Sequence, residues 1–214
     1  ATIDAGGGSV HIRARRQDVF DPDGLVADTS LNMQLEGTIL GASLVEIEGV
    51  KRVEGLAEID AAKPDAVFDP AGSRYRLSGG NIAEAIAQQA GFHFVPGYEI
   101  IGAGNLAIAG SLDLTSSRYG WEIHGRSSAA DAEPGALTIR AAGDIVLSGS
   151  RNDGSPIRGN LVDHPTALEA LNMDAADFDP SVRSWSYTLA AGADLSSADT
   201  LRTLVADKSG DLRI

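Results

Sequence analysis

A five-residue phrase recurs along the chain: Gly, a small polar residue or Ala, an aliphatic residue, a variable residue and a second aliphatic residue. The leading Gly can adopt a positive φ and turn the chain, and the alternation that follows places both aliphatic side chains on one face of a strand. The copies are residues 8–12, 104–108, 135–139, 143–147 and 210–214. The pattern predicts short strands separated by glycine turns.

Related alternation predicts further strands at residues 31–35, 43–48 and 185–189. Residues 81–90 are Ala-rich with apolar positions at 82, 86 and 90, and the flanking Asn81 and Gly91 suit the two ends of a short helix. A weaker helical pattern covers residues 166–173. Turns are predicted at residues 21–24 and 69–72, which both contain Asp-Pro followed by Gly.

Short strands punctuated by glycine are compatible with a sandwich, a barrel or a solenoid. The inward positions are aliphatic with few aromatic residues, and two-residue hairpin turns are scarce, with residues 152–154 the nearest case. Residues 2–4 also begin in mid-pattern, and the last five residues form a complete phrase. We therefore predict an all-β fold, a parallel β-helix (solenoid) segment with short helical and loop excursions, cut from a longer solenoid.

This prediction divides the chain into five segments. Residues 1–60, 98–150 and 183–214 are expected to form β-helix rungs, the last continuing past the chain end. Residues 61–97 are expected to form an excursion that contains the helix 81–90. Residues 151–182 are polar and Asp-rich, and are expected to form a loop excursion.

Composition narrows the function classes. The 214 residues carry a formal charge of −13 at neutral pH, which argues against nucleic-acid or anionic-membrane partners because both require clustered Lys and Arg. The chain has no Cys, so disulfides, thiolate catalysis and Cys-ligated metals are excluded. No apolar run is long enough to insert across a bilayer.

For each motif that could indicate a cofactor or metal site, a purely structural role of the same residues is the better interpretation. Residues 102–107 fit a dinucleotide-binding fingerprint, but strand alternation, not a helix, follows the glycines. Aspartates cluster at positions 174, 177 and 179 and at 21 and 23, without the spacing of an EF-hand. We interpret them as turn and cap residues, with calcium binding left open. The four histidines stand far apart, at positions 11, 93, 124 and 164.

Catalysis is not predicted, and no catalytic residue is assigned. No G-x-S-x-G elbow occurs, and carboxylate pairs are expected by chance in an Asp-rich chain. Trp185 and Tyr187 alternate along a strand, and Trp121 lies near Tyr119. These four aromatic residues are candidates for ligand contact, as a stacking platform for carbohydrate; the alternative, which we prefer, is that they belong to a local core.

Several stretches resemble large, two-partner-secreted bacterial exoproteins of the filamentous-haemagglutinin-like family. They are residues 95–100, 104–106, 113–114, 133–145 and 184–195, with shorter phrases at 2–5, 8–10 and 37–42. The Trp-Ser-Tyr phrase at residues 185–187 is the most specific part. The chain departs from the family at residues 150–155, where members often read Leu-Ser-Asp-Gly-Phe.

The resemblance implies an internal or C-terminal segment of a long right-handed β-helix that crosses the outer membrane of a Gram-negative bacterium through a dedicated secretion partner. The expected function is a structural or adhesive shaft, secreted or displayed at the cell surface. Binding to host, cell-surface or polysaccharide ligands would use exposed loops without catalysis, and the ends would contact further rungs. The alternative is a β-helix protein that binds or cleaves polysaccharide.

Overall fold

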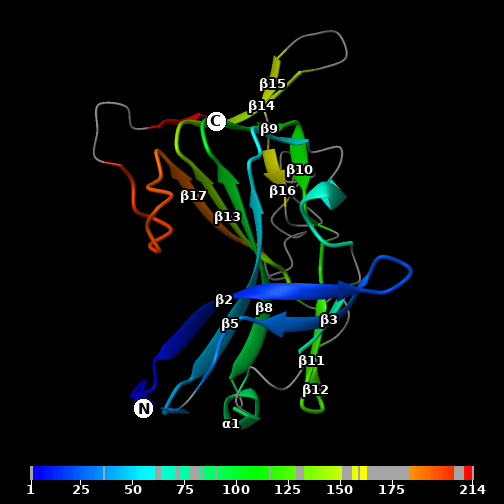
Figure 1. Ribbon diagram of the computed structural model, residues 1–214, viewed down its shortest axis with the longest axis vertical. Helices are drawn as coiled ribbons and strands as arrows, with labels where there is room; N and C mark the ends of the chain where they lie inside the picture. The colour runs from blue at the N-terminus through cyan, green and yellow to red at the C-terminus, as the bar shows by residue number, and fades with distance from the viewer. Residues whose placement is uncertain are drawn as a thin grey trace, which may run out of the picture. The chain divides into compact units, whose positions relative to one another are not determined.

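The computed structural model describes most of the chain. The described residues are 2–35, 37–60, 64–70, 73–77, 82, 84–89, 91–115, 117–128, 133–150, 156–158, 160–162, 184–204 and 210–213. The described part of the chain is mostly β, with 58% of its residues in strands and 3% in helix. The described strands form sheets of two, two, three, five and six strands (Figure 1). No described helix has the length and apolar character needed to cross a membrane.

The chain forms two compact units, each built from separated segments of sequence. Unit 1 comprises Ala1–Lys51, Asp69–Gly97 and Ser117–Ala136. Unit 2 comprises Arg52–Phe68, Tyr98–Ser116 and Leu137–Ile214. The segments interleave, so neither unit corresponds to one continuous stretch of the sequence.

Unit 1 contains the N-terminal strands and the α-helix. Its complete elements are β1 (Thr2–Asp4), β2 (Ser9–Phe20), β3 (Val26–Leu31), β4 (Thr38–Leu40), β7 (Arg74–Arg76), α1 (Glu84–Ala87), β11 (Gly120–Ile123) and β12 (Arg126–Ser127). Strand β1 pairs in parallel with β4, and β11 pairs in parallel with β7 and antiparallel with β12.

Unit 2 contains most of the remaining strands. Its complete elements are β6 (Glu58–Asp60), the 3-10 helix η1 (Pro64–Ala66), β9 (Leu106–Ala109), β10 (Ser111–Asp113), β14 (Ile145–Ser150), β15 (Pro156–Arg158), β16 (Asn160–Val162), β17 (Ser186–Ala191) and β18 (Leu212–Arg213). Strand β14 pairs in parallel with β9 and β18, and antiparallel with β15.

The six-stranded sheet has the order β17-β13-β8-β5-β2-β3. Three of its strands have residues in both units: β5 (Leu44–Glu54), β8 (Phe92–Gly102) and β13 (Ala136–Ala141). Strand β2 runs parallel to β5 and antiparallel to β3.

All five copies of the glycine phrase lead into strands, namely β2, β9, β13, β14 and β18. Three of these strands are neighbours in unit 2 and pair in register, with Leu106 opposite Ile145 and Ile145 opposite Leu212. The strand predictions at these phrases are confirmed. The fingerprint at residues 102–107 leads into strand β9, as the structural interpretation expected.

The prediction of a single parallel β-helix is wrong. The strands form several small sheets that mix parallel and antiparallel pairs, and none of them forms a solenoid. The physical reason lies in the chain reversals. The turn at residues 21–24, in which the Gly24 N–H donates to the Asp21 carbonyl at 3.0 Å, returns β3 antiparallel to β2. Strands β12 and β15 also turn back on the strands before them.

Two local predictions also need correction. Strand β3 ends at Leu31, so the strand predicted at residues 31–35 does not form. The helix predicted at 81–90 is present, but α1 covers only Glu84–Ala87, and positions 81, 83 and 90 lie outside the described residues. The helical pattern at 166–173, His164 and the aspartates at 174, 177 and 179 lie outside them as well.

Candidate functional site: an apolar pocket in unit 1

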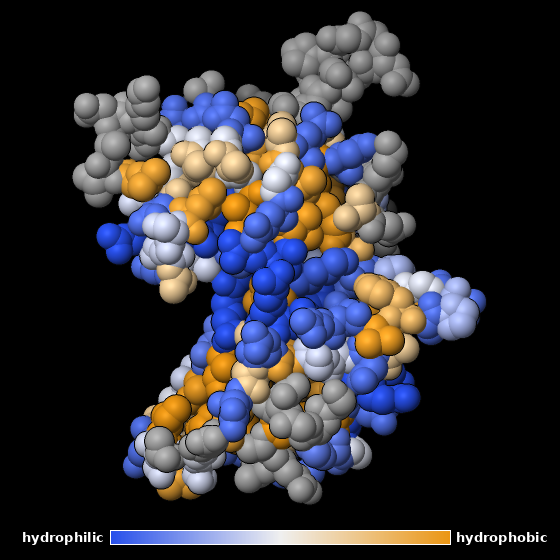
Figure 2. All heavy atoms as spheres, in the orientation of Figure 1, coloured by the Kyte–Doolittle hydropathy of each residue, from blue (hydrophilic) through white to orange (hydrophobic). Residues whose placement is uncertain are grey.

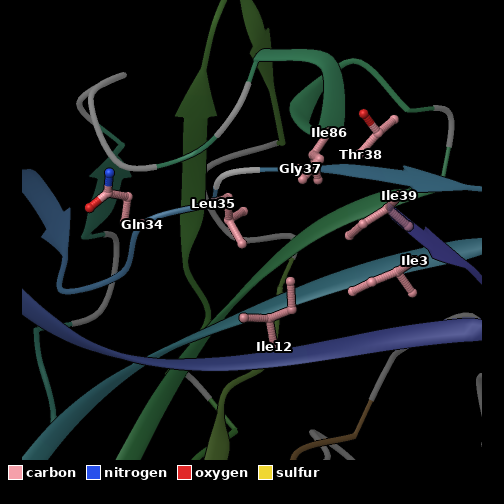
Figure 3. Close-up of a pocket in the computed structure, with 8 residues that line it drawn as sticks. All are labelled: Ile3, Ile12, Gln34, Leu35, Gly37, Thr38, Ile39 and Ile86. Carbon is pink, nitrogen blue, oxygen red and sulfur yellow. The ribbon is translucent and has the colours of Figure 1, made fainter. Parts of the chain in front are cut away.

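A pocket of about 120 Å³ opens between β1, β2, β4 and the helix α1, all within unit 1. Its lining residues are Ile3, Ile12, Gln34, Leu35, Gly37, Thr38, Ile39 and Ile86. Figure 3 shows the side chains of Ile3, Ile12, Leu35 and Ile39 turned toward the same space. Of these eight described lining residues, five are aliphatic and none carries a titratable side chain.

The β1–β4 pair forms one wall of the pocket. In this pair Ile3 lies opposite Ile39. The chain leaves β1 through Gly7, whose φ is +90°, and the Gly7 N–H donates to the carbonyl of Gly41 at 2.6 Å. A residue with a Cβ adopts this backbone conformation rarely, so the turn after β1 depends on glycine.

The helix α1 supplies Ile86 to the pocket. Arg126, on β12, donates from Nη1 to the carbonyl of Ala87 (2.5 Å), the last residue of the helix. The same nitrogen donates to the carbonyl of Gln89 (2.7 Å), just beyond the helix, which also accepts the Phe92 N–H at 3.0 Å. The Gln89 side chain donates to the carbonyl of Ile39 at 2.7 Å. These bonds tie the helix end to β12 and β4, and they fix the position of Ile86 against the β1–β4 pair.

The pocket is partly open to solvent through its most exposed member. Ile3 is 52% exposed, whereas Ile39 and Ile86 are buried. Figure 2 shows apolar side chains gathered at the surface around the place where Figure 1 marks the N-terminus. An apolar cavity of this size is comparable to an engineered cavity of about 150 Å³ that stays dry and binds benzene. The pocket therefore suits one small apolar group.

A second cluster in unit 1 is strongly charged. Arg16 donates from Nη2 to Asp69 at 2.7 Å, and its Nη1 lies 3.0 Å from the Asp18 carboxylate. Lys51 donates to the other Asp69 oxygen at 2.7 Å, and the Tyr75 hydroxyl donates to Asp69 at 2.8 Å. The Arg16 guanidinium also lies over the Tyr75 ring, 4.6 Å from its centroid. We call these five residues the Arg16 network.

The two carboxylates of the Arg16 network have pKa values displaced in opposite directions. Burial alone would raise the pKa of Asp69, but the Arg16 charge and the Lys51 and Tyr75 hydrogen bonds outweigh it, so the pKa lies below its ordinary value of 3.8. Burial raises the pKa of Asp18 above 3.8, against the opposing charge of Arg16 and a hydrogen bond from Thr29.

Carboxylates with divergent pKa values occur in acid–base catalysis, where one is protonated and the other ionised. The side chains of Arg16 and Asp69, however, are fully buried, and that of Asp18 is only 5% exposed. A substrate cannot reach these oxygens in this conformation. The Arg16 network is therefore best explained as a buried structural anchor that joins β2, β5 and the segment before β7.

The aromatic residues singled out from the sequence lie in different places. In unit 1, Tyr119 is buried against Tyr75 at 5.6 Å between ring centroids, and Trp121 is buried against Phe92 at 5.5 Å. In unit 2, Trp185 is buried and packs edge-on against Phe68 at 5.8 Å.

Tyr187 is half-buried on β17. Of the four residues, it therefore has the most surface available to a ligand, and contact with a ligand there stays a prediction. None of the four lines the apolar pocket.

Sequence reasoning missed both clusters, although it contained part of the signal. Ile12 is an inward position of a glycine phrase, and Ile86 is one of the apolar positions that predicted a helix. Their aliphatic character could therefore be read from the sequence, but the fact that both line the same pocket could not. Asp69 was interpreted only as a turn residue. Among the described residues, no group of three or more His, Asp or Glu side chains is placed to hold a metal ion.

Comparisons with protein-family models, with curated proteins and with solved structures found no match to this chain.

Proposed function

We propose that this chain is a non-catalytic binding module of an exported bacterial exoprotein of the filamentous-haemagglutinin-like kind, and that the apolar pocket of unit 1 makes its adhesive contact. The parent protein would leave a Gram-negative cell through an outer-membrane secretion partner and act at the cell surface or after release. The observation that carries the proposal is the lining of the pocket, whose described residues are mostly aliphatic and carry no titratable side chain.

The lining supports binding over chemistry. General acid–base and nucleophilic catalysis require a titratable or nucleophilic group within hydrogen-bond reach of the substrate. Ile3, Ile12 and Ile39 supply neither; they stabilise a complex by removing apolar surface from water. The pocket therefore suits adhesion to a partner through an apolar group.

The class of ligand follows from the size and edge of the pocket. Its volume suits one aliphatic side chain, alkyl branch or benzene-sized ring. Gln34 and Thr38 add amide and hydroxyl groups to a lining that is otherwise aliphatic. Sites of this composition hold an apolar group in the cavity and orient its polar neighbour by hydrogen bonds. The ligand is accordingly an apolar group on a polar stem, as on a protein or glycolipid surface.

The test is binding of the purified 214-residue chain to intact bacterial and animal cells, measured by flow cytometry. Leu35→Gln places an amide in the pocket, and we expect it to weaken binding about tenfold, because burying an unpaired amide costs roughly 1–3 kcal/mol. Leu40→Gln is the matched control, because Leu40 is 51% exposed and does not line the pocket. Cell binding no stronger than that of an unrelated acidic protein would contradict the proposal.

A second measurement separates adhesion from catalysis. The chain is incubated with polygalacturonate, xylan and chitin, and reducing ends are quantified. We expect none to be released above a heat-inactivated control. Release of reducing ends above this control would contradict the non-catalytic assignment, whether or not Leu35→Gln reduces it.

A further inference from the structure

The sheet that contains β9, β14 and β18 repeats one hydrogen-bond pattern from strand to strand. The Leu106 N–H donates to the carbonyl of Asp144 at 2.8 Å, and the Ile145 N–H donates to the carbonyl of Asp211 at 2.9 Å. Leu212 holds the next equivalent position, in register with Ile145. Side chains repeat the pattern: Asn105 Oδ1 accepts the Asp144 N–H at 2.9 Å.

The pattern leaves an aliphatic side chain uncovered at its last strand. Leu106 and Ile145 are fully buried, whereas Leu212 is 44% exposed. Among the described residues, β18 pairs with β14 on one side and with no strand on the other. Because the Asp211 carbonyl faces β14, and peptide groups alternate in direction along a strand, the N–H and C=O of Leu212 face outward.

Strand β1 has a complementary edge. Its Ala5 N–H donates to the carbonyl of Leu40 at 2.9 Å, so the peptide groups of Ile3 and Ala5 face β4 and those of Thr2 and Asp4 face the other side. Among the described residues, β4 is the one strand that pairs with β1. The Ile3 side chain is 52% exposed.

We propose that β18 of one copy of this chain pairs in parallel with β1 of a second copy, with Leu212 opposite Ile3. In this register the Leu212 N–H donates to the Thr2 carbonyl, and the Asp4 N–H donates to the Leu212 carbonyl. This arrangement continues the pattern of Leu106 and Ile145 by one strand. The contact covers the two exposed aliphatic side chains against each other.

Charge complements this register. Arg213 follows Leu212, so in this register its backbone position is opposite that of Asp4. Residue types of opposite charge then hold paired positions, in a chain whose overall charge of −13 otherwise opposes association. Exposed strand edges are templates for strand addition. Because β18 and β1 are different surfaces, the contact is heterologous, and each copy can accept another at either edge.

The pairing is short, so the association is weak. It covers far less than the roughly 1,200 Å² typical of stable interfaces, and we expect it to appear at about 0.1 mM and above. Sedimentation velocity of the 214-residue chain from 10-fold below to 10-fold above that concentration, at an ionic strength near 0.15 M, should show a rising weight-average sedimentation coefficient. A single monomeric species over the whole range would overturn the proposal.

Variants identify the surfaces. Leu212→Asp should weaken association at least about tenfold because it removes apolar burial and adds repulsion toward Asp4. Leu201→Asp is the matched control, since Leu201 is 66% exposed and lies outside β18. Equal effects of the two variants, or no effect of Leu212→Asp, would overturn the proposal.

A charge exchange tests the head-to-tail geometry. Asp4→Arg and Arg213→Asp should each weaken association when alone, because each sets like charges opposite one another. Mixing the two variants should restore association, since each then offers the complementary edge to the other. If two β18 strands paired with each other instead, Asp4→Arg would leave association unchanged. That result would overturn the pairing with β1.

None of these variants alters a residue of the apolar pocket, so loss of association with unchanged cell binding separates this inference from the proposed function.

Discussion

The carboxylate of Glu48 lies against the backbone of Gly97, in the space that a side chain at position 97 would occupy. A Cβ at Gly97 would lie 2.5 Å from Glu48 Oε1 and 2.7 Å from its Cγ. The same carboxylate accepts a hydrogen bond from Arg13 Nε at 2.9 Å and lies 3.2 Å from His11 Nε2. The absence of a side chain at position 97 thus allows a buried Glu to reach two partners on β2.

Gly97→Ala should destabilise unit 1 by about 1–3 kcal/mol, because the new methyl group must displace Glu48 and its ion pair with Arg13. The measurement is the free energy of unfolding in urea. Gly104→Ala is the control, since a Cβ there meets nothing within 4 Å and the backbone does not require glycine. Equal losses of unfolding free energy in the two variants would show that the position of Glu48 does not depend on the absence of a side chain at residue 97.

Asp69→Asn should be among the most destabilising conservative substitutions in unit 1. The change leaves the buried Arg16 guanidinium without its closest charge partner, and breaking a buried ion pair costs roughly 3–5 kcal/mol. Glu122→Gln is the matched control, because its partner Arg76 is 3.8 Å away and both side chains are exposed. That pair contributes about 0–1 kcal/mol. Similar urea midpoints for both variants would contradict a structural role for the Arg16 network.

The Arg16 network also predicts two opposite dependences on pH. The folded-state pKa of Asp69 lies below 3.8, so its stabilisation is present above pH 3.8 and is lost as the pH falls through the folded-state value. The destabilisation caused by Asp69→Asn should therefore shrink toward acid pH. Asp18 binds its proton more readily in the folded state, so its contribution declines as the pH rises from 3.8 through its raised pKa.

The free energy of unfolding of Asp18→Asn, relative to the unsubstituted chain, should consequently increase as the pH rises from 3.8 through the raised pKa of Asp18. Urea unfolding of both variants between about pH 3 and pH 7 measures the two slopes, since this interval brackets the ordinary carboxylate pKa. Slopes of the same sign for Asp18→Asn and Asp69→Asn would contradict the pKa displacements assigned here.

Strands at the glycine phrases were predictable because the phrase is local: a turn-forming Gly and two alternating aliphatic residues determine a short strand without help from distant residues. Which strands pair was not predictable in the same way. Leu106, Ile145 and Leu212 align in register, but the phrase that starts β2 pairs instead with β5. The phrase determines that a strand forms, and tertiary contacts determine which strand it pairs with.

The error in fold class has an identifiable source. Scarcity of two-residue hairpin turns favoured parallel pairing throughout, yet β2 and β3 reverse direction through the longer turn that begins at Asp21. Asp21 Oδ1 accepts the backbone N–H groups of Asp23 and Leu25 at 3.0 and 2.9 Å. The turn itself was predicted. That it closes a hairpin could be learned only from the pairing of the strands on either side.

The sequence could predict the aliphatic character of residues that line the pocket, but not that they come together. Ile12 and Ile86 are 74 positions apart in the sequence and reach the same pocket from a strand and a helix. No local pattern encodes such a meeting. The Arg16 network was hidden for a related reason, because Arg16 and Asp18 sit in a strand whose polar sequence, RARRQD, carries no local sign of the burial that the structure shows.

An NMR titration of the 214-residue chain with benzene, in which labelled Ile and Leu methyl groups are observed, tests whether the apolar pocket binds an apolar group. The methyl signals of Ile3, Ile12, Ile39, Ile86 and Leu35 should shift together and saturate, while those of Leu40 and Leu201 should not. In Leu35→Gln, the benzene concentration that half-saturates the remaining lining signals should rise about tenfold. Unshifted signals from the five lining residues, or equal non-saturating shifts at the exposed leucines, would contradict the claim.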